Sequence, residues 1–256
     1  MPQKPSPTTG GRREELRRQQ EAAAKAARRT GIAVKAAWIT GLAVIALMIG
    51  VTVFALTRPG SAGVAAGTVV APQNATAEGA VVIGKPDAPV AVGIWADFMC
   101  PFCGDFERAN GADLSALVDA GTARLEVHPM SFLDPQSAGS RFSTRTANAF
   151  VAVANDDPAR AWEFSKLIYE NQPAEGTAGL TDAQLADLAR QAGVPDDVVA
   201  TFAAETWVPW IQQLTQQAWD SGITGTPTVK INQTLFTGDI YTPGPLAAAI
   251  TEAARG

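Results

Sequence analysis

Cysteine and histidine are scarce in this sequence, which has two cysteines and one histidine among its 256 residues. The cysteines are Cys100 and Cys103, and the histidine is His128. A structural zinc site usually needs four Cys or His ligands, so we expect no metal site. A structural disulfide between the two cysteines remains an alternative, although a bridge that closes so short a loop would stabilise the fold little. The lack of other cysteines fits an exported domain that avoids crosslinking itself.

Charged residues are missing from a long stretch near the N-terminus, residues 36–57. As a helix this stretch would be roughly 33 Å long, enough to cross the roughly 30 Å hydrocarbon core of a membrane. Residues 1–35 before it hold nine Lys or Arg against three Glu, whereas the rest of the chain is acidic. Segments rich in Lys and Arg next to a transmembrane helix usually remain in the cytoplasm. We therefore predict a single-pass cell-membrane protein with a cytoplasmic tail at 1–35, a transmembrane helix at 36–57 and an extracytoplasmic C-terminal domain.

Aromatic residues are absent from 58–79, which is rich in Gly, Ala, Pro, Ser and Thr. This composition predicts a flexible linker, followed by a folded domain over 80–256. The basic tail is explained by membrane topology and by contact with anionic lipid head groups. We expect no nucleic-acid partner.

Apolar patterning within 80–256 predicts an α/β domain. Residues 90–96 are almost continuously apolar, which indicates a central strand buried on both faces. Other strands are expected at 81–84 and 123–130, helices after the cysteines and throughout 137–222, a hairpin at 226–238, and a last helix at 243–254.

Two smaller expectations concern polar and aromatic residues in these elements. Residues 123–130 alternate between apolar and polar, so we expect a half-buried strand with His128 on its polar face. Pro129 predicts that this strand ends there or lies at an edge of the sheet. Trp207, Trp210 and Trp219 are expected to belong to the core rather than to a cofactor site.

The two cysteines lie where a strand gives way to a helix. Pro101 is suited to the first helical position, which places Cys100 at the helix N-terminus and Cys103 nearly one turn later. The helix terminus stabilises a thiolate, so the pKa of Cys100 is expected to be lowered. Cys100 is therefore the predicted attacking and leaving sulfur, and Cys103 the sulfur that resolves a mixed disulfide.

The motif Cys-Pro-Phe-Cys, the helical block after it and Gly225-Thr226-Pro227-Thr228 before a hairpin resemble the DsbA-like branch of the thioredoxin superfamily. The resemblance covers residues 80–256. It implies a thioredoxin fold with an inserted helical domain at about 137–222 and an enzyme that introduces disulfides into exported polypeptides. It also implies a membrane quinone-linked reoxidase of the DsbB or vitamin K epoxide reductase-like kind, and no cofactor beyond the cysteine pair.

The resemblance further implies that Pro227 is cis and packs beside the cysteines, with the Thr226 backbone holding the substrate. From sequence alone, Pro227 would be expected to be trans. Phe102 stands where DsbA has histidine and offers the thiolate no hydrogen bond. We therefore expect a less depressed Cys100 pKa and a less oxidising protein than DsbA.

A second difference from the family, after Phe102, concerns a buried acidic residue. Many thioredoxin-like proteins have one six residues before the first cysteine, and here that residue is Ile94. Asp97 could serve as a proton relay or cap the helix that begins at Pro101, and capping is our expectation.

Two other functions fit the same residues. One is a disulfide reductase or isomerase that receives electrons through the membrane. The other is a tethered peptide-binding module in which the cysteines form a structural bridge. The chain lacks a dimerisation segment like those of isomerase relatives, so we expect a monomer.

Overall fold

The computed structural model describes residues 69–256. The predicted cytoplasmic tail at 1–35, the predicted transmembrane helix at 36–57 and the first half of the predicted linker lie outside these residues. Within residues 69–256, no helix is both long enough and apolar enough to cross a membrane.

A five-stranded sheet forms the centre of the domain, with strand order β1-β3-β2-β4-β5. β2 pairs in parallel with β3 and antiparallel with β4, and all seven of its residues are buried. The prediction of a central strand buried on both faces is therefore confirmed. The strands are β1 (Val81–Ile83), β2 (Val90–Ala96), β3 (Ala123–Pro129), β4 (Thr228–Ile231) and β5 (Thr234–Leu235).

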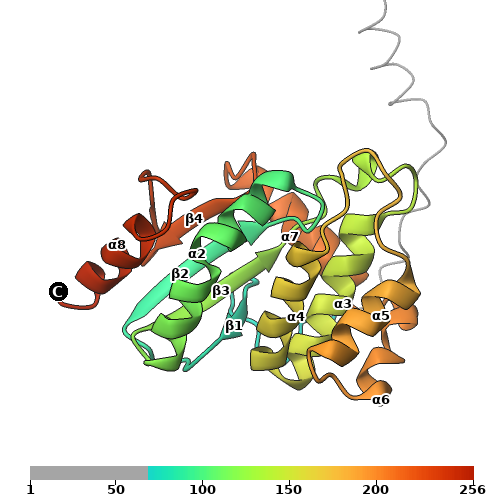
Figure 1. The fold of residues 1–256 in the computed structure, drawn as a ribbon, viewed down its shortest axis with the longest axis horizontal. Helices are drawn as coiled ribbons and strands as arrows, with labels where there is room; N and C mark the ends of the chain where they lie inside the picture. The colour runs from blue at the N-terminus through green and yellow to red at the C-terminus, as the bar shows by residue number, and fades with distance from the viewer. Residues whose placement is uncertain (1–68) are drawn as a thin grey trace, which may run out of the picture. The chain divides into compact units, whose positions relative to one another are not determined.

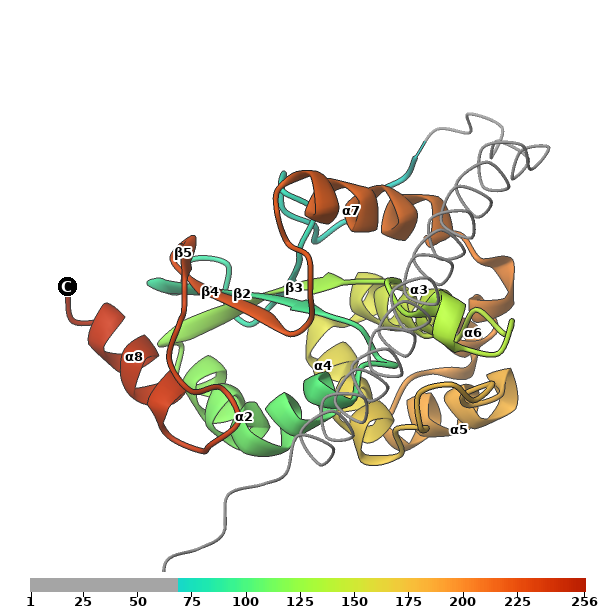
Figure 2. The ribbon, with the colours of Figure 1, turned by 90° about the horizontal axis from the view of Figure 1, so that it is seen from above.

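Helices cover both faces of the sheet (Figure 1). Figure 2 shows α2 and α8 on one face and α7 on the other, while α3 to α6 gather at one end of the sheet. Because this helical block lies between β3 and β4 in the chain, the thioredoxin-like fold with a helical insertion is confirmed. The helices are α2 (Pro101–Asp119), α3 (Phe142–Asp156), α4 (Pro158–Glu170), α5 (Asp182–Gln191), α6 (Asp196–Val199), α7 (Val208–Asp220) and α8 (Pro245–Ala253).

Local sequence signals explain where several elements begin. The Thr181 side chain accepts a hydrogen bond from the Gln184 backbone N–H, and the Gln184 side chain accepts one from the Thr181 N–H, which completes the predicted capping box of α5. Asn232 and Gln233 join β4 to β5 with φ angles of 47° and 69°. Two successive positive φ angles are those of a type I′ hairpin turn, which Asn favours and Gln merely tolerates.

The end of the predicted linker belongs to the folded domain, so that prediction is wrong for its last residues. Pro72 is buried, and the Gln73 N–H donates to Asn155 Oδ1 at 2.9 Å. Asn74 Nδ2 donates to the Ala154 carbonyl at 3.0 Å, at the C-terminal end of α3. Linker-like composition does not reveal such pairing, because the partner groups are about 80 residues away in the chain.

β3 is more deeply buried than its alternation predicts. It lies between β1 and β2 rather than at an edge, although it does end at Pro129. His128 is 5% exposed and stacks on Trp95 of β2, with ring centroids 4.0 Å apart and planes 5° from parallel. Burial lowers the pKa of His128 to about 3, and the Lys230 charge adds to this effect. A neutral imidazole can therefore occupy a position that alternation assigns to solvent.

The expectation of a tryptophan core holds for Trp210, which is buried, and Trp207 packs against the core. It is wrong for Trp219, which is 45% exposed and contacts Phe132 at a ring-centroid distance of 4.5 Å. Trp219 occupies the last turn of α7, where one helix side faces solvent.

Candidate active site

Cys100 and Cys103 lie at the start of α2, shortly after β2 ends at Ala96. Cys100 has extended backbone angles and is the N-cap residue, while Pro101 takes the first helical position as predicted. The Cys103 N–H donates to the Cys100 carbonyl at 3.0 Å. Both cysteines are free thiols, with Cys100 5% exposed and Cys103 fully buried.

The two thiols differ strongly in acidity. The pKa of Cys100 is lowered from 9.0 to about 6, first because the Cys103 thiol donates a hydrogen bond to the Cys100 thiolate. The Thr226 side chain and the backbone N–H groups of Cys103 and Phe102 add to this stabilisation, against the opposing effect of burial. Burial raises the pKa of Cys103 well above its ordinary value. At neutral pH, Cys100 is thus mainly a thiolate and Cys103 a thiol.

The loop before β4 completes the site from the other side. The Thr226–Pro227 peptide bond is cis, and Cys100 Sγ lies 3.3 Å from the Thr226 carbonyl oxygen, to which the protonated thiol can donate. Residues 221–228 line a groove of about 500 Å³ together with Lys230 and Leu235. The structure therefore brings Thr226 next to the cysteines, as the resemblance implies.

An apolar surface adjoins the cysteine pair. Phe102 is 60% exposed and Tyr241 is 49% exposed, and their ring centroids are 6.2 Å apart. Exposed aromatic rings next to a reactive group are typical of a surface that contacts apolar side chains of a partner. Tyr241 comes from the loop between β5 and α8 and was not singled out in the sequence.

Asp97 does not cap α2, so the favoured expectation for this residue is wrong. Its carboxylate is fully buried and accepts three hydrogen bonds. Oδ1 accepts from the Met99 N–H at 2.9 Å and from the Ser143 hydroxyl at 2.7 Å, and Oδ2 accepts from the Leu133 N–H at 2.9 Å. Burial raises the pKa of Asp97 to about 6 despite these bonds. Asp97 thus ties the active-site loop to α3 and to the segment after β3.

We expect Asp97→Asn to destabilise the protein by about 1–3 kcal/mol, because the amide nitrogen would face the Leu133 N–H and leave a buried donor unpaired. Denaturant unfolding at pH 5, below the Asp97 pKa of about 6, measures the change, because the wild type then has no buried charge whose removal would offset it. Ser143→Ala is the matched control and should cost less, since it removes one bond and keeps the carboxylate. Equal stability of Asp97→Asn and the wild type would contradict this structural role.

Gln172 also holds the active-site turn, and sequence reasoning missed it. Its Nε2 donates to the Phe98 carbonyl at 3.0 Å and to the Cys100 carbonyl at 2.8 Å. Gln172 lies just after α4 in the helical insertion, 72 residues from Cys100. Gly104 leaves room for it, since a Cβ at position 104 would be 2.2 Å from Gln172 Oε1. No local pattern in the sequence indicates this pairing.

The Gly104–Gln172 packing leads to a double-mutant prediction. Gly104→Ala should displace the Gln172 amide and so destabilise the protein by about 1–2 kcal/mol, as should Gln172→Ala, through loss of the same two hydrogen bonds. Because both changes remove one interaction, the double variant should be hardly less stable than either single variant. Denaturant unfolding of the four proteins measures this, and additive effects would show that the two residues act independently.

The match to known proteins covers most of the described domain. A sequence model of a family described as thioredoxin matches residues 76–250. The serine/threonine-protein kinase PknE of Mycobacterium tuberculosis is 31% identical over 162 residues, which are 56% of this chain and 29% of the kinase. Disulfide bond formation protein D of Bacillus subtilis is 27% identical over 158 residues, which are 60% of this chain and 68% of that protein. The chain thus spans less than a third of the length of the kinase.

Solved structures show the same fold. Reduced DsbA from Mycobacterium tuberculosis superimposes with a TM-score of 0.56 at 26% identity, covering 68% of this chain and 98% of that chain. MdbA of Actinomyces oris, a thiol-disulfide oxidoreductase, gives a TM-score of 0.60 at 22% identity, over 71% of this chain and 89% of that chain. At 22% identity, the match to MdbA supports the fold alone.

Proposed function

Because the chain belongs to the thioredoxin family, we propose that it is a thiol:disulfide oxidoreductase that introduces disulfides into exported proteins. The observation that carries this proposal is the unequal acidity of two thiols on one helical turn. A Cys100 pKa near 6 stabilises the reduced protein, which makes its disulfide a good oxidant. This favours disulfide donation over reduction or isomerisation.

The reaction begins with the disulfide form of the protein. A client thiolate attacks Cys100 Sγ, the Cys100–Cys103 bond breaks, and its electron pair goes to Cys103, which is then protonated. A second client thiolate attacks the client sulfur of the mixed disulfide, which forms the client disulfide. Cys100 leaves as a thiolate, and its low pKa makes it a good leaving group.

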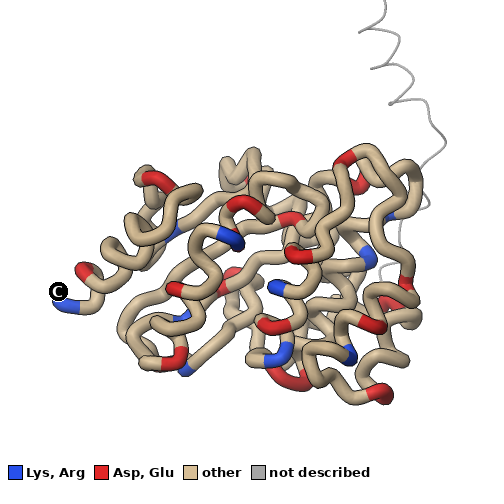
Figure 3. The backbone as a smooth tube through the Cα atoms, viewed as in Figure 1, with Lys and Arg blue, Asp and Glu red and all other residues tan. Residues whose placement is uncertain are grey.

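Client segments bind beside the cysteines in this proposal. The Thr226 backbone and Pro227 border the groove, and Phe102 with Tyr241 forms the neighbouring apolar surface. Unfolded polypeptides expose the apolar side chains that such a surface accepts. Figure 3 shows both acidic and basic residues distributed over the domain. The sequence has 22 Asp or Glu against ten Lys or Arg over 69–256. This charge balance opposes binding to nucleic acids.

Turnover needs a partner that reoxidises Cys100 and Cys103. The predicted membrane helix at 36–57 and the basic tail before it support an extracytoplasmic domain held at the membrane. The domain acts as a monomer in this proposal. That position suits a quinone-linked membrane reoxidase of the DsbB or vitamin K epoxide reductase-like kind.

The test uses the full chain in its disulfide form, mixed with an excess of a reduced, unfolded protein that has two cysteines. The proposal expects one client disulfide formed for each protein disulfide consumed, at pH 7 and without added oxidant. Trapping of free thiols followed by mass spectrometry counts both. Protein that keeps its disulfide while the client stays reduced would overturn the proposal.

A further inference from the structure

Lys230 is a charged residue of β4 that the proposed mechanism does not use. Residues 69–256 contain ten Lys or Arg, and eight of these form a salt bridge with an Asp or Glu of the same range. The two that form no salt bridge within this range are Lys85 and Lys230. Because acidic residues outnumber basic ones in the domain by 22 to ten, a cation without a carboxylate partner is unusual here.

The Lys230 ammonium group is held in place by an aromatic ring. Its Nζ lies over the ring of Trp95, 4.9 Å from the ring centroid, and Trp95 stacks in turn on His128. The three side chains come from the neighbouring strands β4, β2 and β3, so they form one stack across the sheet. Burial lowers the pKa of His128 to about 3, so its ring is neutral and does not repel the ammonium. The attraction between cation and ring positions Lys230 without neutralising its charge.

Lys230 lines the groove beside the active site. It is the charged side chain among the lining residues, which otherwise comprise 221–228 and Leu235. Leu235 of β5 is the direct cross-strand partner of Lys230 and is 54% exposed. Thr226 belongs to the same groove, and its carbonyl oxygen lies 3.3 Å from Cys100 Sγ. The groove therefore connects the reactive sulfur with an ammonium group that can accept a partner.

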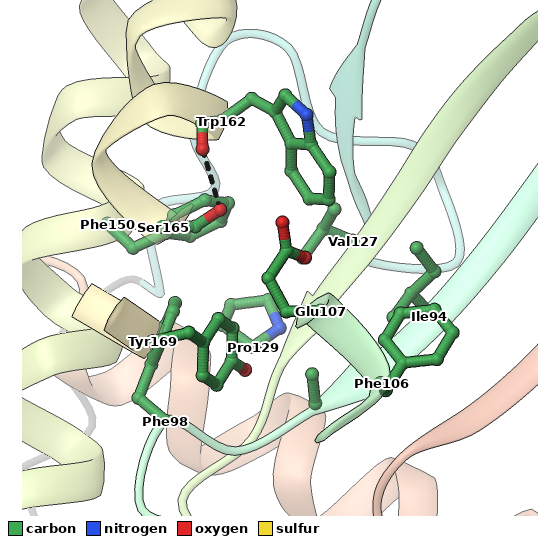
Figure 4. A pocket seen from close by; sticks show the side chains of 11 residues that line it. Ile94, Phe98, Phe106, Glu107, Val127, Pro129, Phe150, Trp162, Ser165 and Tyr169 are labelled. Atoms are coloured by element: carbon green, nitrogen blue, oxygen red, sulfur yellow. Dashed lines mark hydrogen bonds between the residues drawn. The ribbon is translucent and has the colours of Figure 1, made fainter. Parts of the chain in front are cut away.

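This groove lies on the face of the sheet opposite α2. Ile94 and Phe106 line a cavity between β2 and α2 (Figure 4), so the next strand residue, Trp95, points to the other face, and Lys230 lies there with it. The cavity on the α2 face measures about 20 Å³, which has room for about one water molecule and none for a client segment. On the other face, α7 packs against β3 and α3 (Figure 2). The groove beside β4 and β5, of about 500 Å³, has the space that a segment needs.

We propose that Lys230 selects clients with an acidic side chain close to their reactive cysteine, by forming an ion pair with that side chain in the groove. This inference deepens the proposed function and rests on it. Lys230 is a specificity-determining residue in this account and takes no part in the thiol chemistry. Because the domain as a whole is acidic, an acidic segment is attracted where a cation without a partner faces it.

Strand geometry indicates where the acidic residue should lie in the client. Thr226 and Lys230 are four residues apart, and a strand rises about 3.3 Å per residue, so roughly 13 Å separate their backbones along the groove. An extended client segment covers that distance with about four residues. When the client cysteine is bonded to Cys100, beside Thr226, an Asp or Glu about four positions away can therefore reach the Lys230 ammonium group.

The test uses the full chain in its disulfide form and reduced synthetic peptides with two cysteines. One peptide has Asp four residues before the first cysteine, a second has Asp four residues after the second cysteine, and a third has Asn at both positions. We expect the wild type to oxidise one of the Asp peptides about three-fold faster than the Asn peptide, which is the effect of one partly exposed ion pair. Acid quenching, thiol trapping and mass spectrometry give the second-order rate constants.

Three variants complete the test. Lys230→Met keeps a long side chain over Trp95 but removes the charge, so the preference for the Asp peptide should disappear. Lys230→Glu should reverse it, so that a peptide with Lys at the same position becomes the faster one. Lys85→Met, in the turn between β1 and β2, is the matched control and should keep the wild-type preference. Each ratio of rate constants is taken within one protein, so a general loss of activity or stability cancels.

Two results would overturn the inference. One is equal rate constants for the three peptides in the wild type, and the other is an unchanged preference in Lys230→Met. A wild type that oxidises none of the three peptides would instead count against the proposed function, because disulfide transfer itself would then be missing.

Discussion

Replacing Cys103 by serine is expected to convert a transient mixed disulfide into a lasting one. Cys103 is fully buried on the turn that begins at Cys100, and its thiol donates to the Cys100 sulfur. It is therefore the group positioned to expel a protein bound to Cys100. In Cys103→Ser, Cys100 is first converted to a mixed disulfide with an aromatic thiol. A reduced partner protein with one cysteine should then attack Cys100 Sγ, displace the aromatic thiolate and remain attached through Cys100. Non-reducing electrophoresis should show one stable covalent adduct that a reductant removes.

Cys100→Ser is the matched control for this experiment. The remaining thiol, Cys103, is buried and has a raised pKa, so it should neither attack nor hold a partner. We expect no adduct, and oxidation of a reduced client at the rate measured without protein. Adducts of equal yield in the two variants would contradict the division of roles between the two sulfurs.

The stability of the reduced protein is expected to rise relative to the oxidised protein between pH 6 and pH 9. The Cys100 pKa is lowered from 9.0 to about 6 in the folded state, so the folded chain releases this proton at lower pH than the unfolded chain. The unfolded state then binds more protons, and stability increases with pH. A difference of three pKa units corresponds to about 4 kcal/mol of stabilisation. This stabilisation is complete near pH 9 and is lost as the pH falls through 6.

Denaturant unfolding of both redox forms from pH 5 to pH 9 measures this difference. Asp97 and Glu107 have raised pKa values, so they lower stability as the pH rises towards neutrality. They are present in both redox forms, and the comparison between the forms largely removes them. The reduced Cys100→Ser variant should lose the rise above pH 6. A constant difference between the two forms across this range would mean that Cys100 is not acidified.

Signals that are local in the chain predicted most of the fold. The apolar run of 90–96, the proline after Cys100 and the Thr181–Gln184 pair each indicate an element through neighbouring residues, and the structure has those elements. The buried His128 and the packed end of the linker were mispredicted because their burial depends on residues far away in the chain. The alternation of apolar and polar residues and the composition of a segment do not show which distant residues will pack against it.

The same distinction applies to the site. The cysteine pair is visible as a motif, and the cis Pro227 was implied by resemblance and is confirmed. Gln172 carries no local signal, because its importance comes from the contact of the helical insertion with the active-site turn. Asp97 was singled out correctly but given the wrong partners, since its hydrogen bonds reach α3 and the segment after β3.

The redox potential of the Cys100–Cys103 couple tests the central claim most directly. The full chain is equilibrated with mixtures of reduced and oxidised glutathione, and the free thiols are then trapped and counted. With an acidified Cys100 and Phe102 in place of histidine, we expect a potential between about −230 and −120 mV, less oxidising than DsbA but able to donate a disulfide. A potential near −270 mV, roughly that of thioredoxin, or below it would contradict the account and indicate a disulfide reductase.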